Sequence, residues 1–436
     1  MFEIFFHYFI FLFVIFSNGL FFSKIILKDE AINLNFFEKS IVGLIGTGFL
    51  AMFLNFFFPL NDYIFYINIF IGIFFLIKFR KNLIFKYSKE IKIIIFFIFL
   101  LSLFNLYGSE FSDDLNHYHG GSIINTDNHN YIIGLNFLHH HYGYSSIWLI
   151  LHSYLNFNNS FLQDIHILNA ILFFLIVGYL LIESLNHTSK DKKNILFIIS
   201  SIFVFFIIIK YTRLKEFGID RPAVLLYCFA IYFTAKYSYF FEKTAKERNN
   251  FLLSILLICL FITSIKIVFI SCFLIPTIFV INFKSYDFLI KKTSLLIYFF
   301  IFAYFFKNIL ISGCLIYPFE FTCFSSLAWN TKDVASWILP GSEAILKSFN
   351  EYQGTLSPSE YVKNFNWAET WFERNLGELN DYLFTILLAV FLFFLGTSSK
   401  KNQFKLGKFE FLIILFFILN LIFFIKTPVF RFHNML

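Results

Sequence analysis

Charged residues are scarce in this chain of 436 residues, because Asp, Glu, Lys and Arg together make up only 14% of it. Soluble domains carry roughly 25% charged residues. Apolar residues make up 58% and aromatic residues 23%, with 72 Phe among them. A soluble chain of this length has too little polar surface to enclose so much apolar surface, and a disordered chain has the opposite composition. The composition therefore predicts an integral membrane protein.

Cysteine and basic N-terminal residues are also few. The chain has five Cys, none of them in a C-x-x-C pair, so a disulfide scaffold is not expected. Cys314 and Cys323 are candidates for one disulfide if they lie in an oxidising compartment. No basic residue precedes the first apolar run, which predicts a retained span and no cleaved signal peptide. The net charge of +7 does not indicate a nucleic-acid partner, since Lys and Arg in membrane proteins gather on the cytoplasmic side.

Long apolar runs recur along the chain, and a helix needs ~20 apolar residues to cross a bilayer. Suitable windows fall near residues 4–23, 41–59, 63–79, 91–107, 164–183, 194–210, 222–240, 294–312, 381–397 and 409–426. The run 251–283 is too long for one span and short for two. A double crossing places seven later basic residues inside with the basic loop 78–92, and a single crossing only four. We therefore expect two short helices that meet near 263–266, which gives about twelve transmembrane helices with the N-terminus outside.

Two segments between predicted spans are then extracytoplasmic, 108–163 and 313–380. The first contains no Lys or Arg, and eight of the eleven His lie between residues 117 and 166. The second holds four of the five Trp, a residue type that favours membrane interfaces, so we expect it on the bilayer surface. The predicted architecture is all-α. It comprises a three-helix membrane segment (1–90), a membrane core with the acidic His-rich loop (91–312), a Trp-rich lobe (313–380) and C-terminal membrane helices (381–436).

Acidic residues follow the fourth predicted span at Asp113 and Asp114, just before Tyr118 and His119. A carboxylate at the membrane boundary can act as general base on an acceptor hydroxyl. The alternative is a solvated acidic loop. Because carboxylates and imidazoles are ordinary metal ligands, the cofactor stays open, with a divalent cation as one candidate.

Three consecutive histidines, His139, His140 and His141, lie further along the same segment. Consecutive side chains on a helix point in three directions, so these three are not expected to share one metal. The segment predicts amphipathic histidines at a membrane interface.

Basic residues crowd one loop that the topology places outside, namely Lys210, Arg213, Lys215 and Arg221. Such a cluster on the side where positive charge is disfavoured indicates an anionic ligand, and lipid phosphate or pyrophosphate is the nearest one. Local pairing with acidic neighbours is the alternative. Lys266 lies at the expected helix break, where an ammonium group needs a partner or water, and it can either face the same outer cavity or extend to the interface.

Scattered short motifs over residues 91–432 resemble the GT-C superfamily, and more closely a bacterial subgroup of GT-C-like membrane proteins. The matching residues, in order, are Asp114 four positions before Tyr118-His119, Gly134-Leu135, Leu138-His139, Gly143 to Ser146, Ile265-Lys266, Ser312-Gly313, Tyr317-Pro318, Trp329, Pro428 and Arg431-Phe432. Three extra spans precede the acidic loop in this sequence, which departs from the family pattern. The resemblance also implies further helices after Arg431.

The resemblance implies a glycosyltransferase of a bacterial cytoplasmic membrane, with its active face outside. Such an enzyme transfers a sugar from a polyprenyl-phosphate donor to an envelope glycan, lipid or protein. By this analogy Asp114 is the catalytic base and Asp113 its substitute. The substrate-binding residues are then expected to be Tyr118, His119, Arg213, Lys215, Arg221, Lys266 and Arg431.

Two other functions compete with transfer. A transporter or flippase for a lipid-linked precursor predicts ionisable residues in several spans and internal symmetry, and the sequence shows no repeat. A polysaccharide polymerase or ligase is expected to place Arg residues in its outer loops, and the second outer segment has only Arg374.

Overall fold

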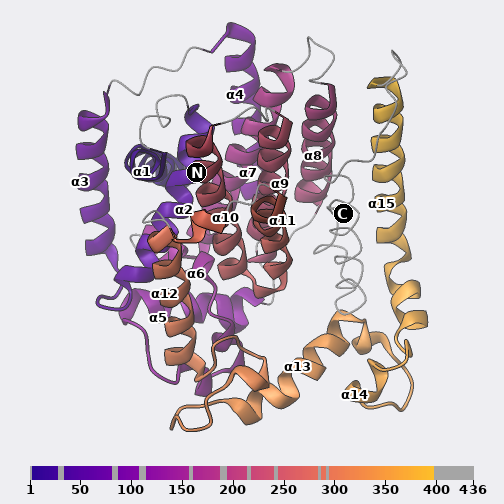
Figure 1. Cartoon of the computed structure of the whole chain (residues 1–436). Coiled ribbons are helices and arrows are strands. Elements are labelled where there is room, and N and C mark those ends of the chain that lie inside the picture. The colour runs from indigo at the N-terminus through magenta and orange to yellow at the C-terminus, as the bar shows by residue number, and fades with distance from the viewer. Residues whose placement is uncertain are drawn as a thin grey trace. The chain divides into compact units, whose positions relative to one another are not determined.

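The computed structural model is helical throughout the part that it describes, which comprises residues 2–27, 34–80, 87–107, 114–156, 161–186, 194–213, 218–239, 244–282, 286–290 and 294–396. The chain divides into two compact units (Figure 1). Unit 1 consists of Met1–Ile132 and Ser145–Lys307, and unit 2 of Ile133–Tyr144 and Asn308–Leu436. The all-α prediction is confirmed for the described residues.

Most of the predicted spans coincide with single helices. The first eight helices are α1 (Phe2–Leu27), α2 (Phe36–Leu54), α3 (Asp62–Lys78), α4 (Lys89–Tyr107), α5 (Gly120–Asn128), α6 (Ile147–Leu155), α7 (Phe161–Asn186) and α8 (Asn194–Arg213). The others are α9 (Asp220–Tyr239), α10 (Ala245–Ile265), α11 (Leu274–Asn282), α12 (Leu295–Ser312), α13 (Lys332–Leu346), α14 (Pro358–Tyr361) and α15 (Ala368–Gly396). Short π- or 3₁₀-helical segments are η3 (Leu115–His119), η4 (Leu135–Phe137), η5 (His140–Tyr144), η6 (Ile267–Phe273), η7 (Tyr286–Ile290), η9 (Glu320–Thr322) and η10 (Phe349–Glu351).

Five helices in the described part are long and apolar enough to cross a membrane, within α1, α2, α7, α10 and α12. The chain is accordingly a helical membrane protein, while the total of twelve spans stays a prediction. The predicted window 409–426 lies outside the described residues. In unit 1, α7 is the central helix, because it is apolar around its whole circumference and 94% of its spanning window is buried.

Glycine sets how closely α1 and α2 approach. A methyl group added at Gly19 would lie 2.0 Å from the Lys39 carbonyl oxygen, and one at Gly43 only 1.9 Å from the Ile15 oxygen. Small residues allow such backbone contact between membrane helices. At the start of α2, the Asn35 carboxamide accepts the Glu38 N–H at 2.9 Å while the Glu38 carboxylate accepts the Asn35 N–H at 2.9 Å, so the helix begins with a capping box.

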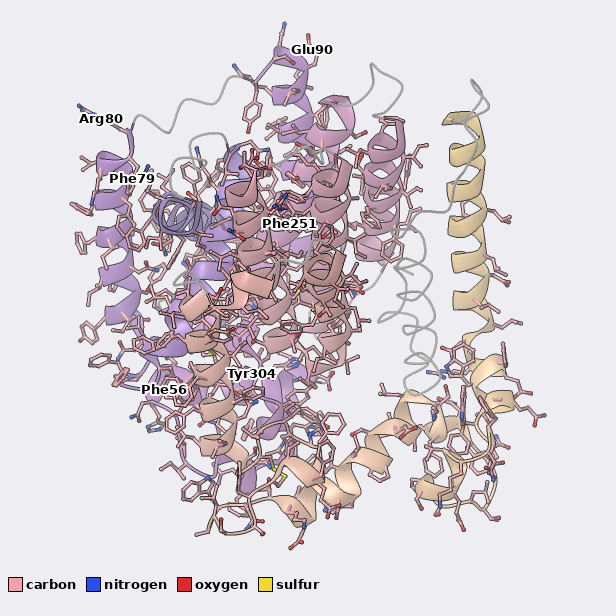
Figure 2. The ribbon with its side chains drawn as sticks, viewed as in Figure 1. Phe56, Phe79, Arg80, Glu90, Phe251 and Tyr304 are labelled. Carbon is pink, nitrogen blue, oxygen red and sulfur yellow. A yellow bond between two sulfur atoms is a disulfide. The ribbon has the colours of Figure 1, made fainter. Side chains whose placement is uncertain are left out.

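The chain breaks and reverses after α10, as the sequence predicted. Lys266 has extended backbone angles, and η6 follows it directly. Cys272 then lies beside Cys259, whose Sγ is 3.3 Å from the Cys272 carbonyl oxygen. Further on, Phe279 reaches Phe251, which Figure 2 labels within the bundle, with ring centroids 4.9 Å apart.

The expectation of two half-length helices around this break was wrong for the first of them. Helix α10 has 21 residues, because Thr244 and Glu247 form its N-terminal cap, and Thr244 lies seven residues before Phe251, where the apolar run begins. The returning arm is the short one and consists of η6 followed by α11.

Unit 2 contains its own core and a disulfide between Cys314 and Cys323, which confirms that candidate pair. The three other Cys, which are Cys228, Cys259 and Cys272, lie outside this disulfide and are buried. Trp367 and Trp371 pack with Ala344 and Tyr361 in the core of this unit, and the two Trp are only 6% and 3% exposed. These two tryptophans fill a protein core, while the position of the lobe on the bilayer surface stays a prediction. Trp337, by contrast, is 59% exposed.

Candidate functional site

Three segments that are far apart in the sequence meet at one end of unit 1. Lys266, at the end of α10, forms a salt bridge with Asp220, the first residue of α9. Asp220 and Lys266 are both close enough to His119, the last residue of η3, to perturb its protonation. We call these three residues and Arg221 the Lys266 cluster.

Two contacts hold Lys266 in position. The Ser146 hydroxyl donates a hydrogen bond of 2.8 Å to the carbonyl oxygen of Ile265, and Ser146 Oγ in turn accepts the backbone N–H of Trp148 at 3.2 Å. Ser146 thus caps the N-terminus of α6 and satisfies a carbonyl at the C-terminus of α10, where helix carbonyls lack intrahelical partners. The backbone leaves the helix at this point with φ −150° and ψ 119° at Lys266, which directs its side chain away from the α10 axis.

The segment that carries His119 is anchored by apolar packing. Leu115, Ile123 and Leu149 form a small buried cluster against which Ile219 packs. Ile219 directly precedes Asp220, so this contact brings η3 to the start of α9. Segment η3 is a π-helix, a rare form of helix that occurs often at functional sites.

His119 is buried and neutral at physiological pH. It is 4% exposed, and Gly218 lies beside its ring, where an added methyl group would make ordinary van der Waals contact with Cε1 at 3.5 Å. Burial lowers the pKa of His119 to about 4, with Asp220 raising the pKa and Lys266 lowering it. Its Nε2 is buried and has no hydrogen-bond partner among the described residues. A neutral imidazole with one uncommitted nitrogen can bind a polar group of a ligand.

Arg221, a member of the cluster, and Tyr118 and Asp114, which precede His119 in the chain, complete the predicted residues near it in the sequence. Arg221 is 8% exposed and lies in the first turn of α9, next to Asp220. The rings of Tyr118 and His119 are in contact, with centroids 4.3 Å apart. Asp114 precedes η3 and is exposed. Positive side chains beside the N-terminus of α9, where the helix dipole also favours anions, suit a phosphate group.

For the remaining predicted site residues, the structure describes no side-chain position. Arg213 is the last residue of α8, and its side chain is not described. Asp113, Lys215 and Arg431 lie outside the described residues. The structure therefore brings together His119, Arg221 and Lys266 from the predicted set, and it adds Asp220. The proximity of Asp220 to Arg221 was visible in the sequence, but its pairing with Lys266 was not.

A second polar cluster, which the sequence did not predict, lies at the other end of α9. Lys236 Nζ is 2.9 Å from a Glu183 carboxylate oxygen and 3.5 Å from one of Glu38. The hydroxyl group of Tyr232 donates to Glu183 at 3.4 Å, and the Tyr179 hydroxyl lies 3.5 Å from Lys236 Nζ. We call these five residues the Lys236 cluster. The charged residues of this cluster lie near the start of α2 and near the ends of α7 and α9. The predicted topology places these three helix ends on the same side of the membrane.

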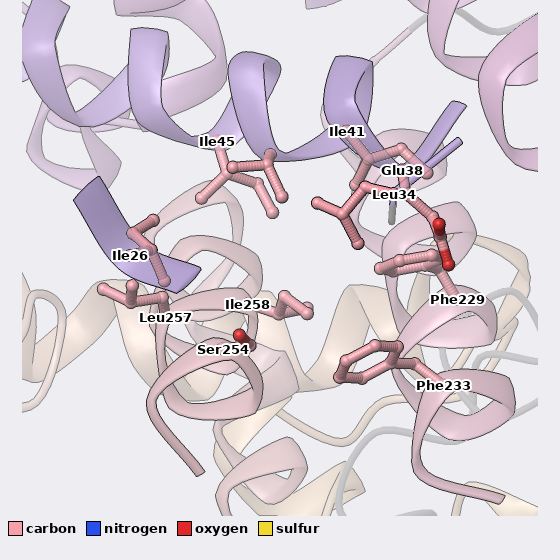
Figure 3. A pocket seen from close by; sticks show the side chains of 11 residues that line it. Ile26, Leu34, Glu38, Ile41, Ile45, Phe229, Phe233, Ser254, Leu257 and Ile258 are labelled. Atoms are coloured by element: carbon pink, nitrogen blue, oxygen red, sulfur yellow. The ribbon is translucent and has the colours of Figure 1, made fainter. Parts of the chain in front are cut away.

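An apolar pocket of about 60 Å³ adjoins the Lys236 cluster (Figure 3). Glu38 and Ser254 are its only residues with polar side chains, and Glu38 belongs to both features. The other lining residues come from α1, α2, the segment before it, α9 and α10, and they are Ile26, Leu34, Ile41, Val42, Ile45, Phe229, Phe233, Leu257 and Ile258. This lining suits a hydrocarbon chain.

Two carboxylates approach one another where α3 begins and α5 ends. Burial, together with the charge of Asp62, raises the pKa of Asp127 to about 6. These two acidic residues are separate from the Lys266 cluster. Among the described residues, no Lys or Arg is found between the two carboxylates.

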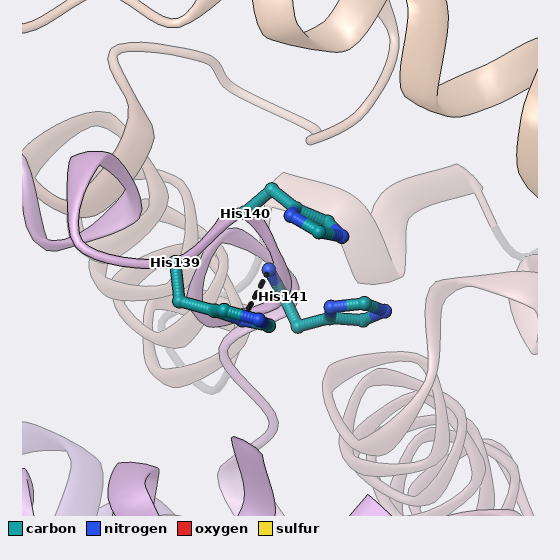
Figure 4. Close-up of side chains that lie close together, drawn as sticks. All are labelled: His139, His140 and His141. Atoms are coloured by element: carbon teal, nitrogen blue, oxygen red, sulfur yellow. Dashed lines mark hydrogen bonds between the residues drawn. The ribbon is translucent and has the colours of Figure 1, made fainter. Parts of the chain in front are cut away.

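In unit 2, the three consecutive histidines lie together (Figure 4). One potential ligand atom from each of His139, His140 and His141 lies within 4.8 Å of the others. The expectation that their side chains diverge was wrong, because this stretch forms a turn that leads into the 3₁₀ segment η5 and not an α-helix. Burial and the neighbouring His139 lower the pKa of His140.

Comparison with known proteins gives one result. A family model described as a domain of unknown function (DUF8201) matches residues 1–436. No curated protein and no solved structure matches the chain.

Proposed function

We propose a function from the residues of the chain itself. The chain belongs along its whole length to the DUF8201 family, a domain of unknown function, and its helices are those of a membrane protein. The protein is a membrane glycosyltransferase that transfers a sugar from a polyprenyl-phosphate donor to an envelope glycan, lipid or protein. The reaction takes place at the Lys266 cluster, on the extracytoplasmic side of a bacterial cytoplasmic membrane.

The observation that carries this proposal is the buried His119 beside the Asp220–Lys266 pair and Arg221. Two cations and one carboxylate leave a net positive site at the ends of apolar helices, where the phosphate of a lipid would lie. A phosphate can replace Asp220 as the partner of Lys266 and can accept a forked pair of hydrogen bonds from Arg221. The Nε2 of His119 is then available to a sugar hydroxyl.

Asp114 supplies the base in this mechanism. The acceptor oxygen attacks the anomeric carbon, the bond between that carbon and the phosphate oxygen breaks, and the polyprenyl phosphate leaves. Asp114 takes the proton of the acceptor hydroxyl. Negative charge grows on the leaving phosphate during the reaction, so Lys266 and Arg221 stabilise the transition state more than the bound donor. Exposure of Asp114 is compatible with this role, because the acceptor must reach it from water.

The disulfide of unit 2 supports the assigned side of the membrane. Cys314 and Cys323 form a bond that persists in oxidising compartments and is rare in the cytosol. The predicted topology places both residues outside by an independent argument from basic residues.

The test is mass spectrometry of envelope glycans in cells that carry Asp114→Asn. This variant keeps the shape of the side chain and removes the base, whose contribution to rate is typically about 10²–10⁴-fold. We expect loss of one defined sugar unit while the protein still accumulates in the membrane. Asp333→Asn, an exposed carboxylate in the first turn of α13, is the matched control and should leave the glycan unchanged. A loss of activity smaller than tenfold in the Asp114 variant removes this residue from the role of base.

The Lys236 cluster supports a second candidate function, that of a flippase for a lipid-linked precursor. Ionisable residues within or at the ends of spans often mark transport pathways. In the same experiment this function predicts a chemically unchanged glycan in reduced amount, with lipid-linked precursors accumulating on the cytoplasmic side.

A further inference from the structure

The loop of residues 133–144 holds the three histidines on a fixed frame. The Gly134 N–H donates to the Leu310 carbonyl oxygen at 2.8 Å, and Gly134 itself has a φ of +72°, a value that favours glycine. The buried carboxamide of Asn136 donates to Thr331 Oγ1 at 2.9 Å and accepts the Gly143 N–H at 3.0 Å. Both ends of the histidine turn are therefore tied to the body of unit 2.

The three imidazole rings face one another within this frame. Their centroids are 4.7 Å apart for His139 and His140, 4.1 Å for His140 and His141, and 5.0 Å for His139 and His141. All three side chains are partly buried, so each is restricted by its surroundings but can be reached from solvent. Aromatic rings adjoin them, with Trp337 5.6 Å from His140 and Tyr144 6.0 Å from His141.

From this geometry we propose that His139, His140 and His141 bind one divalent transition-metal ion of the zinc type. Imidazole nitrogens are among the commonest ligands of such ions. The site is independent of the Lys266 cluster, which lies in unit 1, and of the proposed transfer reaction. With three imidazole ligands and no thiolate, a zinc-type ion keeps a fourth position open for water or for an anionic oxygen.

The distances require a small adjustment on binding. A zinc–nitrogen bond is ~2.0–2.1 Å long, so two ligand atoms of one ion lie no more than about 4.2 Å apart. In a tetrahedral site the ligand atoms lie only ~3.3–3.4 Å apart. Atoms now separated by up to 4.8 Å must therefore approach by up to about 1.5 Å, and the stacked rings must turn so that their nitrogens point to one ion. Rotation of these partly exposed side chains provides both changes. The backbone N–H of His141 points to His139 Nδ1 at 3.4 Å, a distance at which hydrogen bonds are weak, so this contact hardly competes with a metal for that nitrogen.

The test uses the full-length protein in detergent, purified with an affinity tag that contains no histidine. Zn²⁺ binding is measured by competition with a chromophoric chelator, and Cu²⁺ is used as a spectroscopic probe whose electron paramagnetic resonance counts the coordinated nitrogens. We expect one tight site per chain with three imidazole nitrogens. His139→Ala, His140→Ala and His141→Ala should each weaken Zn²⁺ binding by at least ~10- to 100-fold, the range that loss of even an outer-shell partner costs.

The control is His117→Ala, which removes an exposed histidine from unit 1 and should leave Zn²⁺ binding unchanged. Circular dichroism of each variant checks that the fold is retained, and the nitrogen count on the unaltered protein does not depend on any variant folding. The proposal is overturned if the unaltered protein binds no Zn²⁺ above the detergent blank. Cu²⁺ coordination by fewer than three nitrogens, or unchanged Zn²⁺ affinity in all three His→Ala variants, overturns it as well.

Discussion

His119 should give the protein a measurable loss of stability in weak acid. Its pKa in the folded protein is about 4, whereas the ordinary value is 6.5. The folded state binds a proton on this ring less readily than the unfolded state does. The neutral His119 ring therefore contributes fully to the free energy of unfolding above the pKa of the unfolded state. That contribution is lost as the pH falls from 6.5 towards 4. Integrating the difference in bound protons gives a loss of about 2 kcal/mol between about pH 7.5 and about pH 5.0.

The measurement is thermal unfolding in detergent at these two pH values, for the unaltered protein and for His119→Gln. A change of 1 kcal/mol shifts the melting temperature of a large domain by ~2 °C, so the unaltered protein should lose about 4 °C more than the variant. Other titrating groups contribute to both proteins and cancel in the comparison. The exposed neighbour His117→Gln is the control and should follow the unaltered protein. Equal pH dependence in the unaltered protein and His119→Gln would refute the burial argument.

Three further outcomes follow from the described contacts. Since burial and a nearby carboxylate raise the pKa of Asp127 to about 6, its ionisation opposes folding above that pH, so Asp127→Asn should raise the melting temperature at about pH 8 and have little effect at about pH 5. Gly143→Ala places a methyl group 2.7 Å from the Tyr317 ring and should speed hydrogen exchange in residues 133–144, which peptide-level mass spectrometry detects. Finally, Cys314 and Cys323 should react with a maleimide in the unfolded protein only after reduction, and reaction without reductant would contradict the disulfide.

The apolar windows of the sequence predicted most helices well, because length and hydropathy alone determine whether a segment can span a bilayer. The break at Lys266 was also predictable, since a charged residue interrupts a run that is too long for one span. Helix ends were less predictable. Helix α15 starts at Ala368, well before the apolar window near residue 381, because the amphipathic stretch that precedes this window is also helical.

The sequence predicted which residues form most of the candidate site, but not how these residues lie relative to one another. Tyr118, His119, Arg221 and Lys266 stood out as polar residues at the ends of apolar runs. The pairing of Lys266 with Asp220 joins residues 46 positions apart, so it depends on how α9 and α10 pack. The histidine turn likewise depends on a hydrogen bond between Asn136 and Thr331, which are 195 positions apart. Local periodicity contains neither contact.

Both polar clusters of unit 1 contain residues of α9, one cluster near each end of the helix. This arrangement offers a way to distinguish the two candidate functions. Lys236 follows Asp220 by 16 residues, which corresponds to about 24 Å along a helix, close to the ~30 Å thickness of the hydrocarbon core. In the predicted topology, in which α9 crosses the membrane, one cluster lies near each face of the bilayer. A transferase that acts at one face needs only the Lys266 cluster, whereas a flippase must contact the lipid phosphate at both faces.

We therefore expect different results from Lys266→Met and Lys236→Met, which remove one ammonium group each while keeping the length of the side chain. For a transferase, Lys266→Met should weaken donor use by ~10-fold or more, because a charge-assisted hydrogen bond contributes ~1.5–3 kcal/mol. Lys236→Met should lower the amount of folded protein, since it leaves Glu183 and Glu38 without their ammonium partner, but the activity per folded molecule should stay the same. Donor concentration dependence, measured in membranes and normalised to folded protein, distinguishes these effects. An equal loss of donor use per folded molecule in both variants would contradict transfer at one face and would favour movement of the lipid between the two.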